Sequence, residues 1–502
     1  MKYMNKISLP DNLRGVHIHF VGIKGTGMAA LVEILFKNGA IISGSDVSER
    51  FYTDEILEKL GINALPFSEK NITEEIEYVI YSSAYNPEKN PDLKEAVKKG
   101  LPCLLYTQAL GSYSEKAYSV GICGVHGKTS TTGLTGTVLK NLPLPVQILA
   151  GSVINSFGSS CTYTSDNLLK SSRHFFVAET CEYQRHFMSF CPQKIVLTSV
   201  ESDHQDYYPT FKDIQNAFID YICKLPENGT LIYCADDPGA VETTKLAFEK
   251  RKDLKLVPYG EKAEGFYKLT FEGVKSEKNN FFLSGLGSLS ISVPGKHEVR
   301  DACAAVCVAC ELLKEDGKNP SDFVELIHKG LLEFSGGKRR SEIIGRGKTN
   351  DGTSVVVLDD YGHHPTAIST TLSGYKEFYS GRKIIVDFMS HTYSRTEALL
   401  DEFASSFTGA DEIILHKIYS SARENASDFK ITGRTLFEKT REHFSSVHYF
   451  EEILDAKDFI LEELEKPLDK KLYPDGILFV TMGAGDNWKI GKEVLNSLKM
   501  EK

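Results

Sequence analysis

Long hydrophobic runs are absent from the sequence. A membrane-spanning helix needs about 18–20 consecutive apolar residues, and no stretch of the 502 residues approaches that length. The opening residues, MKYMNKISLPDNLRG, contain no apolar core of the kind that a secretory signal has. We therefore expect a cytoplasmic protein with no segment inserted in a membrane.

An excess of basic residues is absent as well. The chain has 58 lysines and arginines against 68 aspartates and glutamates, which gives a formal net charge of −10. Nucleic acids recruit basic surfaces because their phosphate backbone is negatively charged. The charge therefore predicts no nucleic-acid partner, but it leaves small anionic ligands open, since these need only a local positive pocket.

The cysteines lack the second cluster that a tetrahedral zinc site requires. The tightest group is Cys303, Cys307 and Cys310 in the segment DACAAVCVACELL. Their spacing of four and then three residues places all three on one face of a helix. We expect reduced cysteines in a buried apolar stripe, and no zinc.

Apolar runs alternate with amphipathic stretches through most of the chain, which is typical of βαβ units on parallel sheets. The segments VHIHFVG (16–22), YVIYSSA (78–84) and TSVVVLDDYGHHP (353–365) are predicted strands. A chain of this length is too long for one core and predicts about three domains. We predict an α/β fold with three domains, each built on a largely parallel sheet: Rossmann-like over residues 1–115, a P-loop ATPase domain over 116–335, and Rossmann-like over 336–502.

The segment GVHGKTST, which begins at Gly124, is similar to a phosphate-binding loop between a predicted strand and a predicted helix. Gly124 and Gly127 allow a tight turn whose N–H groups can cradle phosphate oxygens. Lys128 would neutralise the β- and γ-phosphates of a nucleotide, and the Thr129 hydroxyl would hold Mg²⁺. Ile122 stands where the usual pattern has its first glycine, so an incidental loop is the alternative.

Acidic residues follow the next two predicted strands. Glu179 and Glu182 follow HFFVA, and Glu201, Asp203 and His204 follow IVLTSV. The ends of neighbouring strands lie beside a phosphate loop, where carboxylates are well placed to hold Mg²⁺ or its waters. The alternative is ordinary polar capping of strand ends.

The first predicted domain contains a dinucleotide-type turn. Gly25, Gly27 and Ala30 in KGTGMAA have the G-x-G-x-x-A spacing, and Asp46 follows about twenty residues later, where a ribose contact is expected. The turn can bind any pyrophosphate, that of a UDP-sugar as well as that of NAD. An NAD-dependent dehydrogenase is therefore an alternative, although no hydride-transfer residues follow the turn.

In the last domain, polar residues again follow strands. VLDDYGHHPTAI supplies Asp360, Tyr361 and His363, and Pro365 there predicts a helix start. MSHTYSRTEALLDEFASSF predicts a strand end, a polar turn with Arg395, and one amphipathic helix. EFSGGKRRSEI places two arginines, Arg339 and Arg340, at the domain junction, where they could grip phosphate or carboxylate, or form a solvated linker.

These segments together resemble the Mur ligase family. The resemblance runs through nearly the whole chain in one order: GIKGTGM, SGSD, SSA, GVHGKTST, AETCEY, ESDHQDYY, PGKH, FSGGKRR, DDYGHHPTAI, HTYSRT and TMGAGD. The combination of DDYGHHPT with YSRT is specific, whereas the glycine turns are not.

The resemblance implies an ATP-dependent acid–amino-acid ligase of peptidoglycan synthesis. It implies that L-alanine is joined to the lactyl carboxylate of UDP-N-acetylmuramic acid through an acyl phosphate, with ATP and Mg²⁺. The first domain would bind the UDP part, the central domain ATP, and the last domain would close over ATP and bring the amino-acid site.

The resemblance also implies a set of site residues. For catalysis these are Lys128, His204, His363 and Arg395. For ATP they are Gly124, Val125, His126, Gly127, Lys128, Thr129, Ser130, His297, Arg339 and Asp360. For the UDP substrate they are Gly25, Thr26, Gly27, Met28, Asp46, Ser83, His126 and Glu182. For the amino acid they are Tyr361, His363 and Arg395, and for the metal Thr129, Glu179 and His204.

The chain departs from the family pattern at several positions. The usual E-x-D-E is E-T-C-E here, with Cys181 in place of the aspartate and both glutamates, Glu179 and Glu182, retained. Glu298 and Asp301 stand where the family has asparagines that read adenine, and a carboxylate cannot donate to adenine N7. Thr392 replaces an arginine, a charge that Arg423 would restore. Two further alternatives stay open: a sibling ligase that attaches a recycled tripeptide, and a nucleotide-binding regulator without ligase activity.

Overall fold

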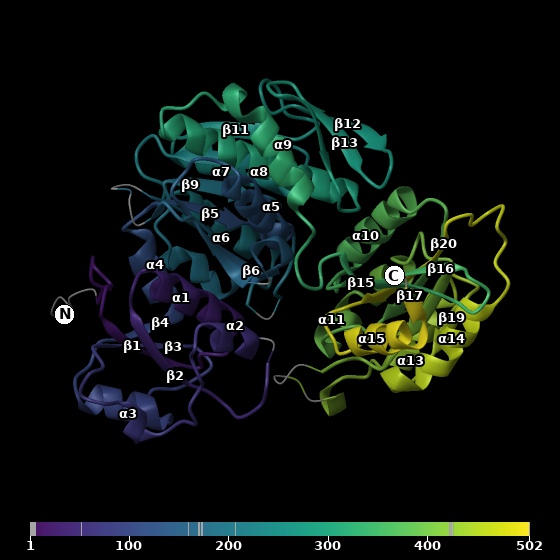
Figure 1. Ribbon diagram of the computed structural model, residues 1–502, viewed down its shortest axis with the longest axis horizontal. Helices are drawn as coiled ribbons and strands as arrows, with labels where there is room; N and C mark the ends of the chain where they lie inside the picture. Colours follow the sequence, from purple (N-terminus) through teal and green to yellow (C-terminus); the bar gives the residue numbers. More distant parts are fainter. Residues whose placement is uncertain are drawn as a thin grey trace. The chain divides into compact units, whose positions relative to one another are not determined.

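The computed structural model of the protein describes residues 7–51, 53–158, 160–168, 171, 174–205, 207–420, 424 and 426–500 (Figure 1). Two compact units are present. One comprises Met1–Thr270, Phe281–Leu289 and Arg300–Phe334, and the other comprises Phe271–Asn280, Ser290–Val299 and Ser335–Lys502. None of the helices in the described part of the chain combines the length and apolarity that crossing a bilayer requires.

The N-terminal sheet has four parallel strands in the order β2-β1-β3-β4. The strands are β1 (His17–Val21), β2 (Ile41–Ser45), β3 (Tyr78–Tyr81) and β4 (Cys103–Leu105), and the helices are α1 (Thr26–Lys37), α2 (Asp54–Lys59), α3 (Pro91–Lys98) and α4 (Tyr106–Ser114), drawn in purple to blue in Figure 1. The predicted strands at 16–22 and 78–84 are confirmed. Because all four strands run the same way, their carboxyl ends share one edge.

The central sheet has seven strands in the order β11-β10-β9-β5-β8-β6-β7, and only the β6–β7 pair is antiparallel among the pairings described. The strands are β5 (Tyr118–Cys123), β6 (Val146–Ile154), β7 (Ser160–Thr164), β8 (Phe175–Glu179), β9 (Lys194–Leu197), β10 (Thr230–Cys234) and β11 (Lys255–Tyr259). The helices are α5 (Lys128–Lys140), α6 (Phe211–Ile222), α7 (Pro238–Lys250), α8 (Lys296–Glu315) and α9 (Val324–Glu333). The phosphate-loop strand β5 therefore lies between β8 and β9, the two strands followed by the acidic clusters.

Helix α1 packs directly on the central sheet, so the first two sheets share one core. The Glu33 carboxylate on α1 accepts hydrogen bonds from the Ser160 hydroxyl on β7 at 2.7 and 2.8 Å. At the end of α1, the Asn38 amide donates to the Gln147 side chain on β6 at 3.3 Å. These polar contacts fix the register of α1 against the central sheet.

A three-stranded sheet follows, with the order β12-β13-β14: β12 (Leu269–Val274), β13 (Asn279–Leu283) and β14 (Gly287–Ile291). Helix α8 carries the cysteine stripe predicted from spacing. Cys303, Cys307 and Cys310 are all fully buried and reduced. The prediction of a buried apolar helix face is confirmed.

The C-terminal sheet has seven strands in the order β19-β18-β17-β20-β16-β15-β21. The strands are β15 (Glu342–Lys348), β16 (Ser354–Asp360), β17 (Arg382–Phe388), β18 (Glu412–Leu415), β19 (Val447–Tyr449), β20 (Gly476–Met482) and β21 (Lys499–Met500), and the helices are α10 (Pro365–Phe378), α11 (Tyr393–Ala398), α12 (Leu400–Ser405), α13 (Gly433–Thr440), α14 (Lys457–Glu465) and α15 (Trp488–Ser497). Strands β16 to β20 are parallel, and β15 pairs antiparallel with β16 and β21.

The predicted α/β class with three largely parallel sheets is confirmed by these pairings, whereas the exact domain limits at 115/116 and 335/336 stay predictions. Pro365 is the first residue of α10, as predicted. Two expectations are wrong. Arg395, predicted in a polar turn, lies within α11, and the single helix predicted after that turn is two short helices, α11 and α12. Leu399 leaves the helical region, with φ −122° and ψ 31°, and separates α11 from α12.

Candidate active site

The phosphate loop connects β5 to α5, as the sequence predicts. Gly127, with φ +80°, is the N-cap of α5, and Gly124 has φ +142°. A Cβ on Gly124 would lie 2.0 Å from the Thr198 hydroxyl, and one on Gly127 would lie 2.6 Å from the Asp301 carboxylate. Both positions therefore require glycine, for conformation and for space.

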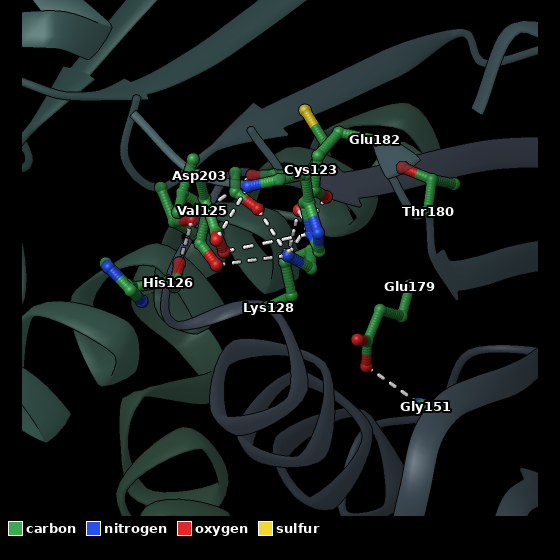
Figure 2. A network of polar contacts seen from close by, with 12 residues as sticks. Cys123, Val125, His126, Lys128, Gly151, Glu179, Thr180, Glu182 and Asp203 are labelled. Carbon is green, nitrogen blue, oxygen red and sulfur yellow. Dashed lines mark hydrogen bonds and ion pairs between the residues drawn. The ribbon is translucent and has the colours of Figure 1, made fainter. Parts of the chain in front are cut away.

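Lys128, the first residue of α5, forms a buried ion pair with Glu182 (Figure 2). Its Nζ lies 3.0 Å from each Glu182 carboxylate oxygen, and it also donates to the Gly124 carbonyl at 2.5 Å and the Val125 carbonyl at 3.1 Å. The side chains are 14% and 2% exposed. The phosphate loop thus fixes the positively charged Lys128 ammonium against its own backbone carbonyls.

Electrostatics keeps both partners of this pair charged. Burial alone would lower the pKa of Lys128, but the charge and the hydrogen bond of Glu182, together with the nearby Glu179 charge, leave the pKa raised. Burial alone would raise the pKa of Glu182, but Lys128 and a hydrogen bond from His204 leave the pKa lowered. The pair is therefore an ammonium–carboxylate pair at neutral pH.

A second carboxylate, Glu179, lies at the end of β8 on the other side of the loop. It accepts a hydrogen bond from the Thr129 hydroxyl at 3.1 Å. It also accepts one from the Gly151 N–H of β6 at 2.7 Å (Figure 2). A Cβ on Gly151 would come within 2.6 Å of that carboxylate. The contacts bring Thr129 and Glu179, two of the predicted metal ligands, within hydrogen-bonding distance of each other.

His204, the third predicted metal ligand, lies beside Glu182. Its Nε2 is 3.5 Å from a Glu182 oxygen and 3.7 Å from an Asp203 oxygen. Its backbone has φ +54°, a left-handed conformation uncommon for a non-glycine residue. The Tyr183 ring packs on the imidazole, with centroids 4.8 Å apart. Strained backbone of this kind is typical of residues that a functional site holds in place.

His126 occupies the turn of the phosphate loop and contacts Glu201 at the end of β9. Its Nε2 pairs with the Glu201 carboxylate, and its N–H donates to the Ser199 hydroxyl at 2.8 Å. The motif pattern gave no sign of Ser199 or of Thr198, whose hydroxyl donates to the His126 carbonyl. These residues fix the loop to β9.

A cavity of about 430 Å³ opens at the ends of β9 and β10. Glu201 lies on its wall, together with Asp237 and Glu242 at the start of α7. The Asp237 carboxylate caps α7 by accepting the Ala240 N–H at 2.7 Å. Glu201 thus both lines this cavity and contacts His126 of the phosphate loop.

Six of the eight residues predicted for the UDP substrate lie at the carboxyl edge of the N-terminal sheet. Thr26, Gly27 and Met28 form the first turn of α1, and Gly25 is its N-cap. Ser83 lies in the turn after β3. Glu182 and His126, also predicted for this substrate, lie at the phosphate loop of the same compact unit.

Asp46, predicted to contact a ribose, holds the glycine turn itself. Its carboxylate accepts hydrogen bonds from the Lys24 N–H at 2.7 Å, the Val47 N–H at 2.8 Å and the Tyr85 hydroxyl at 3.0 Å. Burial, and next this contact, raise the pKa of Tyr85 to about 12. The sequence gave no signal for Tyr85, because nothing in its spacing links it to Asp46.

In the second unit, Arg339 and Asp360 are held by the strands that surround them. The Arg339 guanidinium pairs with Asp359 at 2.8 Å and donates to the carbonyls of Gly483 and Gly485 at 2.6 and 3.1 Å. The Asp360 carboxylate accepts hydrogen bonds from the Ser341 N–H at 2.8 Å and hydroxyl at 3.5 Å, from the Gly362 N–H at 2.7 Å and from the Tyr375 hydroxyl at 3.3 Å. These contacts tie the segment before β15 to the end of β16 and to the loop after β20.

The residues predicted for the amino acid follow β16 and β17. The Tyr361 and His363 rings lie 5.0 Å apart, and the His363 and His391 rings 6.5 Å apart. An Arg395 nitrogen is 3.5 Å from the His391 carbonyl. Burial first, and Arg395 second, lower the pKa of His391, so that imidazole is neutral at pH 7. The structure brings Tyr361, His363 and Arg395 to one edge of the C-terminal sheet.

The predicted ATP residues are divided between the two units. Residues 124–130 belong to the first unit, and His297, Arg339 and Asp360 to the second. Ser130 lies in the first turn of α5. Of the departures from the family pattern, Glu298 and Asp301 are buried on α8 and Thr392 is the N-cap of α11, while Arg423 lies outside the described residues.

Three family models match consecutive parts of the chain. The model of the Mur ligase family, catalytic domain, matches residues 17–118. The Mur ligase middle domain matches residues 122–309, and the Mur ligase, glutamate ligase domain, matches residues 339–484. Together the three models match most of the chain.

Curated relatives match over nearly their full length. The chain is 46% identical over 501 residues to the UDP-N-acetylmuramate–L-alanine ligase of Treponema pallidum (strain Nichols), a match that covers 99% of this chain and 100% of that protein. It is 35% identical over 476 residues to the protein of the same name from Borreliella afzelii (strain PKo), a match that covers 94% of this chain and 97% of that protein.

The fold is shared with a solved structure. The crystal structure of UDP-N-acetylmuramate-alanine ligase from Thermotoga maritima matches with a TM-score of 0.71 and 23% identity, over 96% of this chain and 98% of that chain.

Proposed function

Because the chain belongs to the Mur ligase family, we propose that it joins L-alanine to the lactyl carboxylate of UDP-N-acetylmuramic acid, with conversion of ATP to ADP and phosphate. The observation that carries the proposal is the charged pair of Lys128 and Glu182 beside the Thr129–Glu179 contact, at the edge of the central sheet. Identity of 46% to the Treponema pallidum protein over the full length supports the choice of substrates.

The chemistry needs a phosphate donor. A carboxylate is a poor electrophile because its leaving group would be oxide. Transfer of the γ-phosphate of ATP to the lactyl carboxylate gives an acyl phosphate, and the amine of L-alanine then attacks its carbonyl carbon. The tetrahedral intermediate collapses to the amide and releases phosphate.

Lys128 supplies the positive charge for the first transfer. Its ammonium is fixed by two loop carbonyls and by Glu182, so little reorganisation is needed when phosphate oxygens approach. Lys128 is also the first residue of α5, and a helix N-terminus favours anions through its N–H groups that have no acceptor inside the helix. Positioning and charge are the main contributions that a protein makes to phosphoryl transfer.

The donor set fits Mg²⁺. The Thr129 hydroxyl and the Glu179 carboxylate offer hard oxygen ligands 3.1 Å apart, and Mg²⁺ prefers such ligands together with waters. His204 would be the third ligand, through a ring nitrogen. When bound, Mg²⁺ would neutralise charge on the ATP phosphates.

The sugar nucleotide is assigned to the N-terminal sheet. The turn from Gly25 to Met28 begins α1, whose N–H groups and positive end can hold the pyrophosphate. The same compact unit carries the phosphate loop, so one core would hold both substrates of the first transfer.

The amino acid is assigned to Tyr361, His363 and Arg395. The His363 Nδ1 lies 2.9 Å from the Tyr361 carbonyl, which can only accept, so Nδ1 carries the hydrogen. Nε2 is then the basic nitrogen that can take the proton from the amine of L-alanine. Arg395 would pair with the carboxylate of the amino acid.

A phosphate-release assay tests the proposal. The protein would receive magnesium and ATP with UDP-N-acetylmuramic acid, and in turn L-alanine, glycine, L-serine or a cell-wall tripeptide. We expect release that requires both the sugar nucleotide and L-alanine. Release with the tripeptide alone would indicate the sibling ligase, and no release with any acceptor would indicate a regulator. A change in nicotinamide absorbance without ATP would indicate the dehydrogenase.

A further inference from the structure

Tyr106, directly after strand β4, lies at the carboxyl edge of the N-terminal sheet, to which the sugar nucleotide is assigned. No sequence motif includes Tyr106. The turns after β1, β2 and β3 carry the residues already assigned to that edge. Strand β4 ends at Leu105, and Tyr106 is the first residue of α4. Since all four strands are parallel, Tyr106 leaves the sheet at the same edge as the glycine turn.

The Tyr106 ring lies directly on the first turn of α1. A Cβ on Gly27 would be 2.9 Å from Cζ and 3.0 Å from the hydroxyl oxygen of Tyr106. Gly27 is the second residue of α1, so its N–H is among those without an acceptor inside the helix. The tyrosine hydroxyl therefore lies beside the N–H groups that would hold the pyrophosphate.

The hydroxyl is available as a donor. Within the described residues, no side chain or backbone group accepts a hydrogen bond from it. Burial first, and the nearby Glu179 charge second, raise the pKa of Tyr106, so the phenol keeps its proton at every physiological pH. A neutral phenol next to helix N–H groups can donate to an anionic oxygen.

Helix α4 holds Tyr106 in place. The Gln108 side chain accepts from the Leu105 N–H at 2.9 Å, which fixes the first turn of α4. At the other end, the Ser114 hydroxyl accepts the Cys191 N–H at 2.9 Å, so α4 is tied to the central sheet domain. The tyrosine needs little ordering when a ligand arrives.

We propose that Tyr106 is a substrate-binding residue whose hydroxyl donates a hydrogen bond to a pyrophosphate oxygen of the sugar nucleotide held at the start of α1. This assignment rests on the proposed function, because it takes the UDP part of the substrate as the ligand of that edge. In this assignment Tyr106, which follows β4, joins the residues that follow β1, β2 and β3 in the site for the sugar nucleotide.

Tyr106→Phe tests the assignment by calorimetric titration of UDP and of uridine. A hydrogen bond to a charged group contributes enough to predict about tenfold weaker UDP binding in the variant. Uridine has no phosphate, so its affinity should not change. In turnover, the KM for UDP-N-acetylmuramic acid should rise about tenfold, with kcat and the KM for ATP unchanged.

Tyr113→Phe is the matched control. Tyr113 lies on the same helix, but its hydroxyl contacts Gln147 and Asn38 at the junction with the central sheet. We expect that variant to bind UDP like the unaltered protein. Equal UDP affinity in Tyr106→Phe and the unaltered protein would overturn the assignment, as would an equal loss for UDP and uridine, which would indicate ring packing only. Absence of UDP binding by the unaltered protein would overturn the proposed function, and this assignment with it.

Discussion

Replacement of Lys128 by alanine separates the chemistry of the phosphate loop from its stability. The substitution removes the ammonium that the loop holds and leaves Glu182, which is 2% exposed, without its main partner. Two effects follow, one on phosphoryl transfer and one on folding. The structure gives an expected size for each.

The effect on catalysis should be large. Removing one fixed donor to a developing negative charge typically costs about 10²–10³ in rate, or about 3–4 kcal/mol, and Lys128 carries a full charge. We therefore expect kcat for phosphate release to fall by about 10³-fold or more. Lys140→Ala, in the last turn of the same helix, should keep normal turnover, since Lys140 donates to the Ser156 carbonyl at the far end of α5 from the loop.

The effect on stability should be smaller than for a fully isolated buried charge. Breaking a buried pair by removing one partner costs about 3–5 kcal/mol. His204 lies 3.5 Å from Glu182 and can still donate to it, so we expect about 3 kcal/mol, at the low end. The double variant Lys128→Ala, Glu182→Gln should recover most of this loss in thermal melting and none of the activity.

The double variant also decides how to interpret a loss of activity. If it melts like the unaltered protein and remains inactive, the loss belongs to the missing charge and not to a damaged fold. Turnover above about a tenth of normal in Lys128→Ala would refute the role of the loop in phosphoryl transfer, and with it the energy source of the proposed ligation.

Three further predictions follow from other sites. Glu179→Gln should raise the Mg²⁺ concentration for half-maximal phosphate release about tenfold or more, because a neutral amide is a weaker Mg²⁺ ligand. If the variant needs the same Mg²⁺ concentration as the unaltered protein, the predicted metal site is wrong. His363→Ala should lower kcat by about 10²-fold and shift the acidic limb of the pH–rate profile, and a profile with the same limb would exclude it as the base. Burial opposes a charged His416, but Asp387 at 2.7 Å outweighs burial and raises the pKa of His416. The His416–Asp387 pair therefore stabilises the fold fully below the pKa of an unfolded histidine, about 6.5. This stabilisation is lost as the pH rises through the pKa of His416 in the folded protein. The melting temperature of the unaltered protein should therefore exceed that of His416→Gln by several degrees at about pH 6, and by less as pH rises; a constant difference would contradict this sign.

The main elements of the fold can be predicted from local sequence. Apolar runs of five to seven residues form buried strands such as β1, β5 and β16, because runs this short that are apolar on both faces are typical of strands at the centre of a sheet. The phosphate loop was visible because its glycines and Lys128 stand together in the chain. The acidic residues after β8 and β9 were expected near the loop, and the strand order β9-β5-β8 places them on its two sides.

Contacts between distant segments could not be predicted in the same way. The end of one helix at Leu399 depends on the packing of the C-terminal core, and helical periodicity alone continues through it. Asp46 had the expected spacing for a ribose contact, yet the structure shows it bonded to Tyr85, 39 residues away. Spacing identifies a polar residue at a strand end, but its partner is set by tertiary structure.

Glycines in the motifs show most clearly what is missing from sequence alone. The pattern predicts Gly27 and Gly124 as positions where backbone must approach a ligand. In the structure each also faces a side chain from another segment: Tyr106 lies on Gly27, and Thr198 on Gly124. An added methyl group would meet those partners even with no ligand bound. Each of these glycines is therefore required for two reasons: the backbone must approach a ligand, and a side chain of the protein lies where a Cβ would be. The sequence pattern indicates the first reason. The second, seen in the structure, identifies Tyr106 as a neighbour of the pyrophosphate site.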